Sequence, residues 1–334
     1  DAGVPPLPTP GDLAAWLGLT TDRVDWLADR LRPEERPAAG AVHYHHRWKG
    51  RRLIEAPKRT LRSVQRRILD GILADVPPHP AAVAFRPGVS VVDGAARHVG
   101  QPMVVRFDLR DFFASVRRAR VRAIFARLGY PDPVADLLAN LTTHATPAAV
   151  FDAVAPRDAE AHRAHVERRR RFAERHLPQG APSSPALANL SVYGLDCRLA
   201  ALARTLGATY TRYADDLVLS GDFAPNPVVR LVDRIVRSEG FALNAAKTRV
   251  MAASQRQRVT GVVVNARPNV ARADFDRLKA VLTNCARHGA ASQNRDAHPA
   301  WQAHLEGRVA WVASVHPERG ARLRALLAQI DWSA

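Results

Sequence analysis

Two adjacent aspartates, Asp215 and Asp216, are the residues whose type and spacing most directly suggest chemistry in this sequence. They stand between two β-rich runs, 208–213 and 217–220, which predict a hairpin with the acids near its turn. Adjacent carboxylates repel each other, and a divalent cation bound between them would neutralise that charge. A solvated turn with two acids is the alternative, and the flanking strands alone do not exclude it.

A third carboxylate, Asp108, comes much earlier in the chain and ends the short apolar run 103–108. If this run is a buried strand beside the Asp215–Asp216 turn, three carboxylates gather on one rim of a sheet. Mg²⁺ prefers such hard oxygen ligands. Two Mg²⁺ ions roughly 3.5–4 Å apart can clamp the attacking and leaving oxygens of an in-line phosphoryl transfer. The spacing therefore favours a phosphoryl-transfer enzyme with two metal ions.

Three motifs resemble the successive palm motifs of reverse transcriptases. They are 107–113 (Phe-Asp-Leu-Arg-Asp-Phe-Phe), 177–185 (Leu-Pro-Gln-Gly-Ala-Pro-Ser-Ser-Pro) and 213–216 (Tyr-Ala-Asp-Asp), and their order and rough spacing also match. The chain is most similar to the bacterial retron type, as Val259-Thr260-Gly261 and the segment 94–98 indicate. That segment reads Gly-Ala-Ala-Arg-His, where the family's usual pattern begins with Asn.

The resemblance implies a right-hand polymerase fold of the α/β class, with fingers, a palm on a small antiparallel sheet and a helical thumb. Strands that alternate with helices around the acidic motifs also suggest an α/β palm. The expected division is an N-terminal helical extension over 1–40, fingers over 41–103, a first part of the palm over 104–117, a fingers insertion over 118–178, a second part of the palm over 179–265, and the thumb over 266–334.

The resemblance also implies roles for single residues. Asp108, Asp215 and Asp216 would hold the two Mg²⁺ ions, with the Leu109 carbonyl as a further ligand. Lys247 is the candidate general acid for the pyrophosphate leaving group, since a protonated amine neutralises developing charge. A surface lysine is the alternative for that position.

Further residues are expected at the nucleotide and at the RNA. The nucleotide-binding set is Arg51, Arg52, Leu109, Asp111, Phe113 and Gln179, and the RNA- or primer-binding set is His98, Val259, Thr260 and Gly261. Phe113 stands five residues after Asp108, where the family places a bulky side chain that excludes a 2′-hydroxyl and so favours dNTPs. Arg51 and Arg52 stand at the tip of a hairpin predicted over 43–54, and solvated charge is the alternative for that tip.

The composition favours a polyanionic partner. The 49 Lys and Arg residues exceed the 32 Asp and Glu residues, which gives a net charge of +17. Arg-rich codon bias is the alternative source of this excess. Three segments supply basic residues on expected helices: the amphipathic helix 61–73, the run 166–171, and the helical segment 266–334. For the run 166–171, a solvated face and an RNA contact are both open.

Other sequence features limit the alternatives. The two cysteines suggest no disulfide framework, and for His43, His45 and His46 we expect a surface or RNA-facing role because no Cys or acid follows at metal-ligand spacing. No apolar run reaches the roughly 18–20 residues of a membrane span, and nothing in the given sequence resembles a signal peptide, so a soluble cytoplasmic protein is expected. The chain begins at Asp1 rather than Met, so we expect its native N-terminus to lie upstream.

The function implied is retron-type reverse transcription. The partners would be a dedicated structured noncoding RNA that serves as template and primer, the RNA–DNA duplex formed on it, dNTPs and a separate effector protein, with no membrane. Synthesis would start from a 2′-hydroxyl of an internal guanosine and give a branched RNA–DNA (msDNA) in phage defence. Three alternatives stay open: a group II intron-like or other non-retron defence polymerase, an RNA-binding protein with a degenerate palm, and RNA-dependent RNA synthesis, which Phe113 disfavours.

Overall fold

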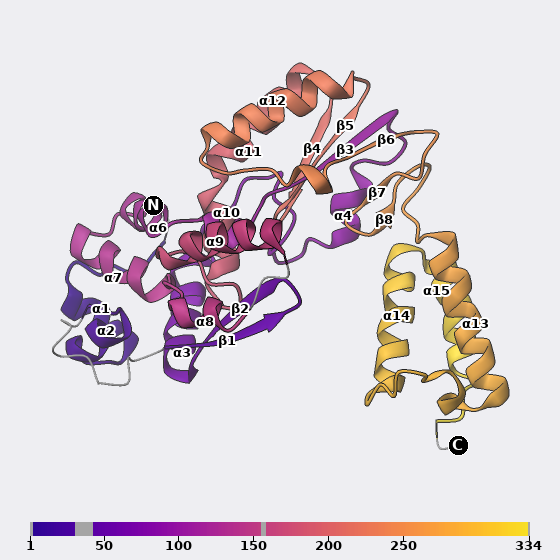
Figure 1. Ribbon diagram of the computed structural model, residues 1–334, viewed down its shortest axis with the longest axis horizontal. Coiled ribbons are helices and arrows are strands. Elements are labelled where there is room, and N and C mark those ends of the chain that lie inside the picture. The colour runs from indigo at the N-terminus through magenta and orange to yellow at the C-terminus, as the bar shows by residue number, and fades with distance from the viewer. Residues whose placement is uncertain (1–2, 31–42, 155–157, 333–334) are drawn as a thin grey trace. The chain divides into compact units, whose positions relative to one another are not determined.

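The computed structural model describes residues 3–30, 43–154 and 158–332, and its chain forms two compact units (Figure 1). The first unit comprises Asp1–Phe85, Leu109–Leu199 and Arg230–Asn244, and the second comprises Arg86–Asp108, Ala200–Val229 and Ala245–Ala334. The expected boundary between the N-terminal extension and the fingers falls at 40–41, outside the described residues. The six-segment division into fingers, palm and thumb stays a prediction.

The first unit is mainly helical. Its elements are α1 (Pro10–Leu17), α2 (Thr21–Leu27), β1 (Tyr44–Lys49), β2 (Arg52–Pro57), α3 (Arg59–Ile68), the π-helical turn η2 (Leu69–Leu73), α5 (Phe112–Ser115), α6 (Arg118–Arg127), α7 (Asp132–Thr142), α8 (Ala148–Asp152), α9 (Ala159–Ala173) and α10 (Ser184–Ser191). Two helices, α11 (Tyr193–Thr205) and α12 (Pro225–Ser238), contain residues of both units.

Strands β1 and β2 form the hairpin that the sequence predicts. Their register pairs Lys49 with Arg52 beside the turn, and it pairs His46 with Glu55 further along. Leu53 and Glu55 face inward and are buried, whereas Arg52 is exposed. The alternation of inward and outward side chains is that of a strand with one buried face. This geometry leaves the arginines at the hairpin tip free of the core.

The second unit contains a four-stranded antiparallel sheet and three long helices. Its elements are α4 (Val91–Ala96), β3 (Met103–Asp108), β4 (Thr209–Tyr213), β5 (Asp216–Gly221), the 3₁₀ turn η3 (Ala245–Lys247), β6 (Arg249–Ala252), β7 (Arg258–Val259), β8 (Val262–Val263), α13 (Arg272–His288), the 3₁₀ turn η4 (Ala290–Gln293), α14 (Trp301–Val315) and α15 (Pro317–Leu327). The strand order is β4-β5-β3-β6, which Figure 1 shows side by side. The small antiparallel sheet expected from the sequence is confirmed.

The central strands of this sheet are stabilised by the burial of apolar side chains. Val104 and Val105 on β3 and Leu217 and Leu219 on β5 are fully buried, and their packing fixes the end of the sheet where the aspartates lie. Helices α13, α14 and α15 bury Leu282, Leu305, Leu323 and their neighbours against one another. None of the helices in the described ranges is both long and apolar enough to cross a membrane.

Candidate active site

Asp108 and Asp216 are direct cross-strand partners. Asp108 ends β3, Asp216 begins β5, and the antiparallel register places the two residues opposite each other. Opposite residues of an antiparallel pair carry their side chains on the same face, with Cβ atoms about 4.5–5.5 Å apart. The register therefore brings two distant carboxylates together at the end of the sheet, as the sequence predicted.

The turn between β4 and β5 contains only Ala214 and Asp215. Tyr213 pairs with Asp216 to close the hairpin. Ala214 has a φ of 55°, in the left-handed region, where a side chain with a Cβ costs roughly 1–3 kcal/mol. Such a tight turn keeps Asp215 next to Asp216, so the three acids cluster at one end of the sheet.

Two cations accompany these acids. The Lys247 ammonium, from η3, donates a hydrogen bond to Asp108 Oδ2 at 2.8 Å, and Arg106 Nε lies 3.6 Å from Asp216 Oδ1. The Asp108 side chain is only 7% exposed, and that of Lys247 is 49% exposed. The pairing gives the nearly buried Asp108 carboxylate a charged partner at the edge of solvent.

Burial raises the pKa of Asp216 above its ordinary value, and the nearby carboxylates Asp215 and Asp108 raise it further against the opposing effect of Arg106 and Lys247. Ionisation of Asp216 is therefore costly unless more positive charge arrives. The donors are hard carboxylate oxygens of the kind that Mg²⁺ prefers, so the residues present fit divalent metal ions of that type.

His98 was expected to contact RNA, but its side chain is fully buried in the second unit. One ring nitrogen lies 2.7 Å from Ser220 Oγ on β5, and the other lies 2.6 Å from Thr211 Oγ1 on β4. Burial lowers the pKa of His98 to about 4, so the imidazole is neutral at pH 7. The structure thus places His98 against one face of the sheet, where it joins the end of α4 to β4 and β5, and the expected direct contact does not fit a fully buried side chain.

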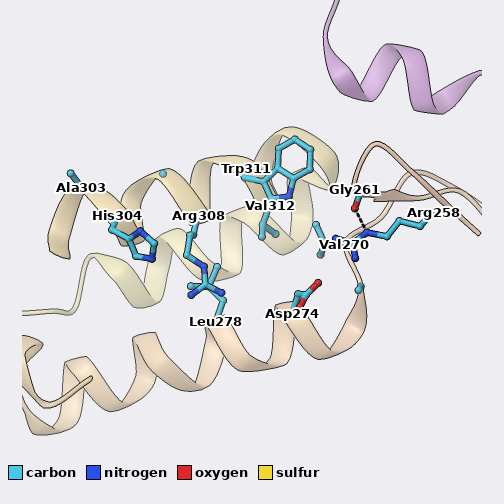
Figure 2. A pocket seen from close by; sticks show the side chains of 12 residues that line it. Arg258, Gly261, Val270, Asp274, Leu278, Ala303, His304, Arg308, Trp311 and Val312 are labelled. Carbon is cyan, nitrogen blue, oxygen red and sulfur yellow. Dashed lines mark hydrogen bonds between the residues drawn. The ribbon is translucent and has the colours of Figure 1, made fainter. Parts of the chain in front are cut away.

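Val259, Thr260 and Gly261 lie at the turn between β7 and β8. The Val259 side chain is buried, and Thr260 and Gly261 adopt φ values of 45° and 94°. Gly261 lines a cavity of about 440 Å³ between this turn and α13 and α14 (Figure 2). The cavity is also lined by Arg258, Asp274, His304, Arg308 and Trp311, whose side chains Figure 2 shows around it.

In the first unit, Phe113 and the turn that follows Gln179 line one cavity of about 420 Å³. Its other lining residues include Arg62 and Arg66 on the exposed face of α3, which belong to the basic amphipathic helix that the sequence predicted. The Glu55 N–H donates to the Gln179 carbonyl at 2.8 Å and fixes this turn to β2. The cavity thus combines an aromatic side chain, two guanidinium groups and the Gly180–Pro182 backbone.

Gly180 is required where the chain approaches β2. Its φ is 128°, and a Cβ placed there would lie 3.2 Å from both the Glu55 carbonyl oxygen and Ile54 Cγ2. Any larger residue therefore has to displace either the turn or the strand.

Asp111 lies under two arginines of α9. Arg168 Nε is 3.3 Å from one carboxylate oxygen, and Arg171 Nη1 is 2.9 Å from the other. Arg168 also donates to the Arg51 carbonyl at 2.8 Å, so it links the hairpin tip to Asp111. The Arg51 and Arg52 side chains are exposed, whereas Leu109 is buried and forms an isolated bridge with Leu243. For the run 166–171, the sequence left open whether its arginines are solvated or contact RNA. Arg168 and Arg171 are instead engaged with Asp111 within the protein.

Comparison with known proteins identifies the class of this chain. The family described as reverse transcriptase (RNA-dependent DNA polymerase) matches residues 45–264. The chain is therefore an RNA-directed DNA polymerase by class. A solved structure of telomerase from Candida albicans aligns with a TM-score of 0.42 and 14% identity, over 85% of this chain and 54% of that chain.

Curated relatives narrow the class. The retron Mx65 reverse transcriptase of Myxococcus xanthus is 42% identical over 96% of this chain and 71% of its own length. The retron Mx162 reverse transcriptase of the same species is 34% identical over 96% of this chain and 67% of its own length. The retron Ec86 reverse transcriptase of Escherichia coli is 28% identical over 84% of this chain and 77% of its own length. The chain belongs to the retron reverse transcriptases.

Proposed function

We propose that Asp108, Asp215 and Asp216 hold two Mg²⁺ ions for template-directed nucleotidyl transfer. The observation that carries this proposal is the cross-strand pairing of Asp108 with Asp216 at the end of the sheet. When bound, the ions would activate the attacking hydroxyl and hold the triphosphate. The carbonyl of Leu109, the residue after Asp108, is the further ligand proposed. The three acids supply the charge that such ions neutralise, which the raised pKa of Asp216 supports.

Lys247 is the proposed general acid. Its ammonium is already hydrogen-bonded to Asp108 and half-exposed, so it carries a proton beside the carboxylates and can reach a solvent-facing leaving group. A proton given to the pyrophosphate oxygen would offset the charge that develops as the bond breaks.

The nucleotide-binding role is assigned to residues of the first unit. Arg51 and Arg52 at the hairpin tip would bind the triphosphate, since guanidinium groups match phosphate geometry. Phe113 would lie under the sugar and exclude a 2′-hydroxyl, and Gln179 would contact the nucleotide or template. The shared cavity of Phe113 and the Gly180–Pro182 turn supports this assignment, and it adds Arg62 and Arg66 as phosphate or template contacts. For Asp111 we propose a positioning role through Arg168.

The β7–β8 turn and the thumb, residues 266–334, are the proposed place of RNA recognition. The cavity beside Gly261 offers the exposed ring of Trp311 with the guanidinium groups of Arg258 and Arg308. Unpaired RNA bases stack on aromatic rings and on arginine, and 2′-hydroxyls report RNA to hydrogen-bonding groups. In this proposal Val259 acts from the core beneath the turn, and Thr260 and Gly261 face the RNA.

We further propose that the template is a structured noncoding RNA that also supplies the priming 2′-hydroxyl, that the product is a branched RNA–DNA, and that the enzyme serves phage defence with a separate effector protein. The retron membership supports these proposals, and the net charge of +17 fits an RNA partner.

One experiment tests both the catalytic role of the carboxylates and the branched RNA–DNA product. Nucleic acid that copurifies with the wild-type protein is sequenced beside that from Asp215→Ala/Asp216→Ala, with Asp222→Ala as a matched exposed carboxylate at the far end of β5. We expect DNA joined covalently to one small RNA in the wild type and in the Asp222 variant, and RNA alone in the double variant. Equal DNA in all three samples contradicts the catalytic assignment. DNA that is absent from the double variant but joined to no RNA favours the group II intron-like alternative.

A further inference from the structure

A group of side chains of metal-ligating types lies in the first unit, whereas Asp108, Asp215 and Asp216 belong to the second. His46 on β1 and Glu55 on β2 are direct cross-strand partners, and His144 follows the end of α7. One donor atom from each of the three residues lies within 4.8 Å of the other two. A surface or RNA-facing role was predicted for His43, His45 and His46. This is wrong for His43, because that residue is buried and its Nε2 hydrogen-bonds the Trp26 carbonyl.

The Nε2 atoms of the two histidines in this group face each other. His46 Nε2 and His144 Nε2 are 3.0 Å apart, and His144 Nε2 is 3.9 Å from Glu55 Oε1. Ligands of one tetrahedral Zn²⁺ lie about 3.3 Å from each other, given Zn–N and Zn–O distances of about 2.0–2.2 Å. The His46–His144 separation is just below that value and the His144–Glu55 separation just above it, while the third separation is within 4.8 Å. Rotation of the side chains would bring all three atoms to one ion.

Without an ion, the contact between His46 Nε2 and His144 Nε2 is a hydrogen bond, so one of the two atoms carries a proton. Both atoms need a free lone pair to bind a metal, so the ion would take the place of that proton.

Glu55 is held in place by hydrogen bonds. The carboxylate is completely buried, and Thr146 Oγ1 donates to its Oε1. His176 Nε2 lies 3.0 Å from Oε2, and His176 Nδ1 lies 2.7 Å from the Glu174 carbonyl. A carboxylate oxygen keeps a second lone pair after one hydrogen bond, so Oε1 can still bind an ion. Metal-binding carboxylates usually have such outer hydrogen bonds, which orient them and raise affinity.

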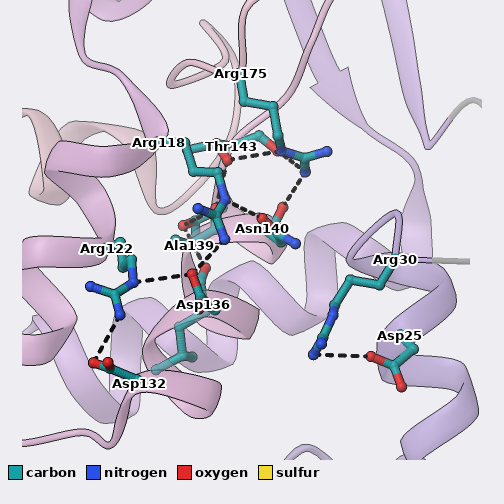
Figure 3. Close-up of polar contacts among 12 residues, drawn as sticks. Asp25, Arg30, Arg118, Arg122, Asp132, Asp136, Ala139, Asn140, Thr143 and Arg175 are labelled. Atoms are coloured by element: carbon teal, nitrogen blue, oxygen red, sulfur yellow. Dashed lines mark hydrogen bonds and ion pairs between the residues drawn. The ribbon is translucent and has the colours of Figure 1, made fainter.

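His144 is also held in place by several contacts. Its backbone N–H and carbonyl exchange hydrogen bonds with those of His176, both at 2.9 Å, and its ring stacks on Tyr44 with centroids 4.1 Å apart. Arg175 donates to the carbonyls of Asn140 and Thr143 on either side of the end of α7. Figure 3 shows Arg175 at these residues, with Arg118 and Arg122 around Asp136 on the same helix. The segment that carries His144 is therefore rigid.

We propose that His46 Nε2, His144 Nε2 and Glu55 Oε1 bind one divalent transition-metal ion, of which Zn²⁺ is the best match. Two imidazoles and a carboxylate suit Zn²⁺, whereas Mg²⁺ prefers oxygen ligands alone. His46 is half-buried, so its side of the site reaches solvent, from which a water would supply the fourth ligand. This ion is distinct from the ions assigned to Asp108, Asp215 and Asp216.

The site would act as a cross-link in the nucleotide-binding unit. It ties β1 and β2, whose turn carries Arg51 and Arg52, to the segment after α7. Glu55 also holds the turn of Gln179 through its backbone N–H. Loss of the ion is therefore expected to loosen the hairpin and raise the KM for dNTPs, with a smaller effect on kcat.

The test uses the full chain without a histidine tag. Wild type, His46→Ala and Asp216→Asn are compared with His45→Ala, which removes an exposed imidazole next to His46 on the same strand. After incubation with Zn²⁺ and dialysis against excess Mg²⁺, metal content is measured by mass spectrometry. We expect one Zn²⁺ per chain in wild type, His45→Ala and Asp216→Asn, and loss of that ion in His46→Ala. Added Zn²⁺ should raise the Tm of the three binding proteins only.

Equal zinc content in wild type and His46→Ala overturns the proposal, and so does the absence of stoichiometric zinc from the wild type. Loss of zinc from Asp216→Asn overturns it too, because the ion would then belong to the polymerase carboxylates. If His46→Ala does not fold, titration of the wild type with Co²⁺ decides: visible d–d absorption that saturates at one equivalent and is removed by Zn²⁺ supports the site, and its absence contradicts it.

Discussion

Asp108 and Asp216 face each other across the antiparallel pair of β3 and β5, although they are far apart in the sequence. The first is nearly buried and bonded to Lys247, and the second has a raised pKa because of burial and the neighbouring acids. The pair is stable only when positive charge is close by, which Lys247 and Arg106 supply in part. The three carboxylates outnumber these two cations, so the end of the sheet favours binding of further positive charge.

Asp216→Asn should abolish DNA synthesis while the fold remains. We expect activity to fall by more than about 100-fold, since even loss of a group that only supports a metal ligand costs 10–100-fold. In EDTA the Tm should rise, because the variant removes a carboxylate whose ionised form is disfavoured by burial. Primer extension and thermal unfolding measure the two effects, with Asp222→Asn as the exposed control. Activity near the wild-type level would contradict the assignment of Asp216.

Lys247→Gln should slow the chemical step. Removal of a general acid costs typically 10²–10⁴-fold, and we expect a fall of about 100-fold in the single-turnover rate with dNTP binding less affected. The Tm without divalent ions should also fall, since Asp108 loses its charged partner. Lys58→Gln, exposed at the start of α3, is the matched control for loss of a lysine. A single-turnover rate equal to that of the control would exclude Lys247 as the acid.

Phe113→Ala should relax the choice between dNTPs and NTPs. The smaller side chain leaves room for a 2′-hydroxyl, and a change in packing of this size alters selectivity by about 10–200-fold. The ratio of kcat/KM for dNTP over NTP measures the effect. Tyr193→Ala removes an exposed aromatic ring that does not line this cavity and should leave the ratio unchanged. If both variants keep the wild-type ratio, Phe113 does not read the sugar.

Gly180→Ala should disturb the Gln179 turn, because the added Cβ would lie 3.2 Å from the Glu55 carbonyl and from Ile54 Cγ2. We expect a loss of about 1–3 kcal/mol in the free energy of unfolding and a raised KM for dNTPs. Gly88→Ala is the control, since Gly88 also has a positive φ of 72° but an added Cβ there meets nothing within 4 Å. It should lose about 1–2 kcal/mol through the backbone alone, with an unchanged KM.

His98 should make stability depend on pH. Its pKa is lowered to about 4 in the folded protein, from 6.5. As the pH falls, His98 is therefore protonated in the unfolded chain before it is protonated in the folded protein. Its contribution to the free energy of unfolding is complete above pH 6.5 and is lost progressively toward pH 4. It amounts to about 3 kcal/mol, at 1.36 kcal/mol per pKa unit.

His98→Gln should accordingly flatten the fall in unfolding free energy between pH 7 and pH 4, because the amide hydrogen-bonds Ser220 and Thr211 but does not titrate there. Denaturant unfolding at a series of pH values gives the slope. His162→Gln, an exposed position on α9, should keep the wild-type slope. A slope equal in all three proteins would show that the buried His98 does not control it.

Local patterns made several parts of this protein predictable. The β4–β5 hairpin around Ala214 and Asp215 follows from two β-rich runs on either side of two short side chains, and the β1–β2 hairpin follows from the basic glycine turn. These hairpins depend on neighbours in the chain. The grouping of Asp108 with the later acids was predicted on the condition that the run 103–108 is a buried strand beside their turn, and from the order of the motifs, which resembles that of reverse transcriptases.

Contacts between distant segments were not predictable in the same way. The sequence offered His46 no metal-binding partner, yet the hairpin register puts Glu55 opposite it, and the end of α7 brings His144 from 98 residues away. His98 looked accessible until Ser220 and Thr211 from two later strands enclosed it. No local rule reports which side chain another segment will cover.

By itself the sequence determined the family, the three carboxylates and the small antiparallel sheet, because motif residues and strand periodicity are properties of short segments. The tertiary structure decided which face each residue occupies and which charges meet. It paired Asp108 with Lys247, buried His98, and joined His46, Glu55 and His144. The reason is physical: burial and close charge pairs arise only when strands and helices from different parts of the chain pack together, and they change the chemistry of a side chain whose type stays the same.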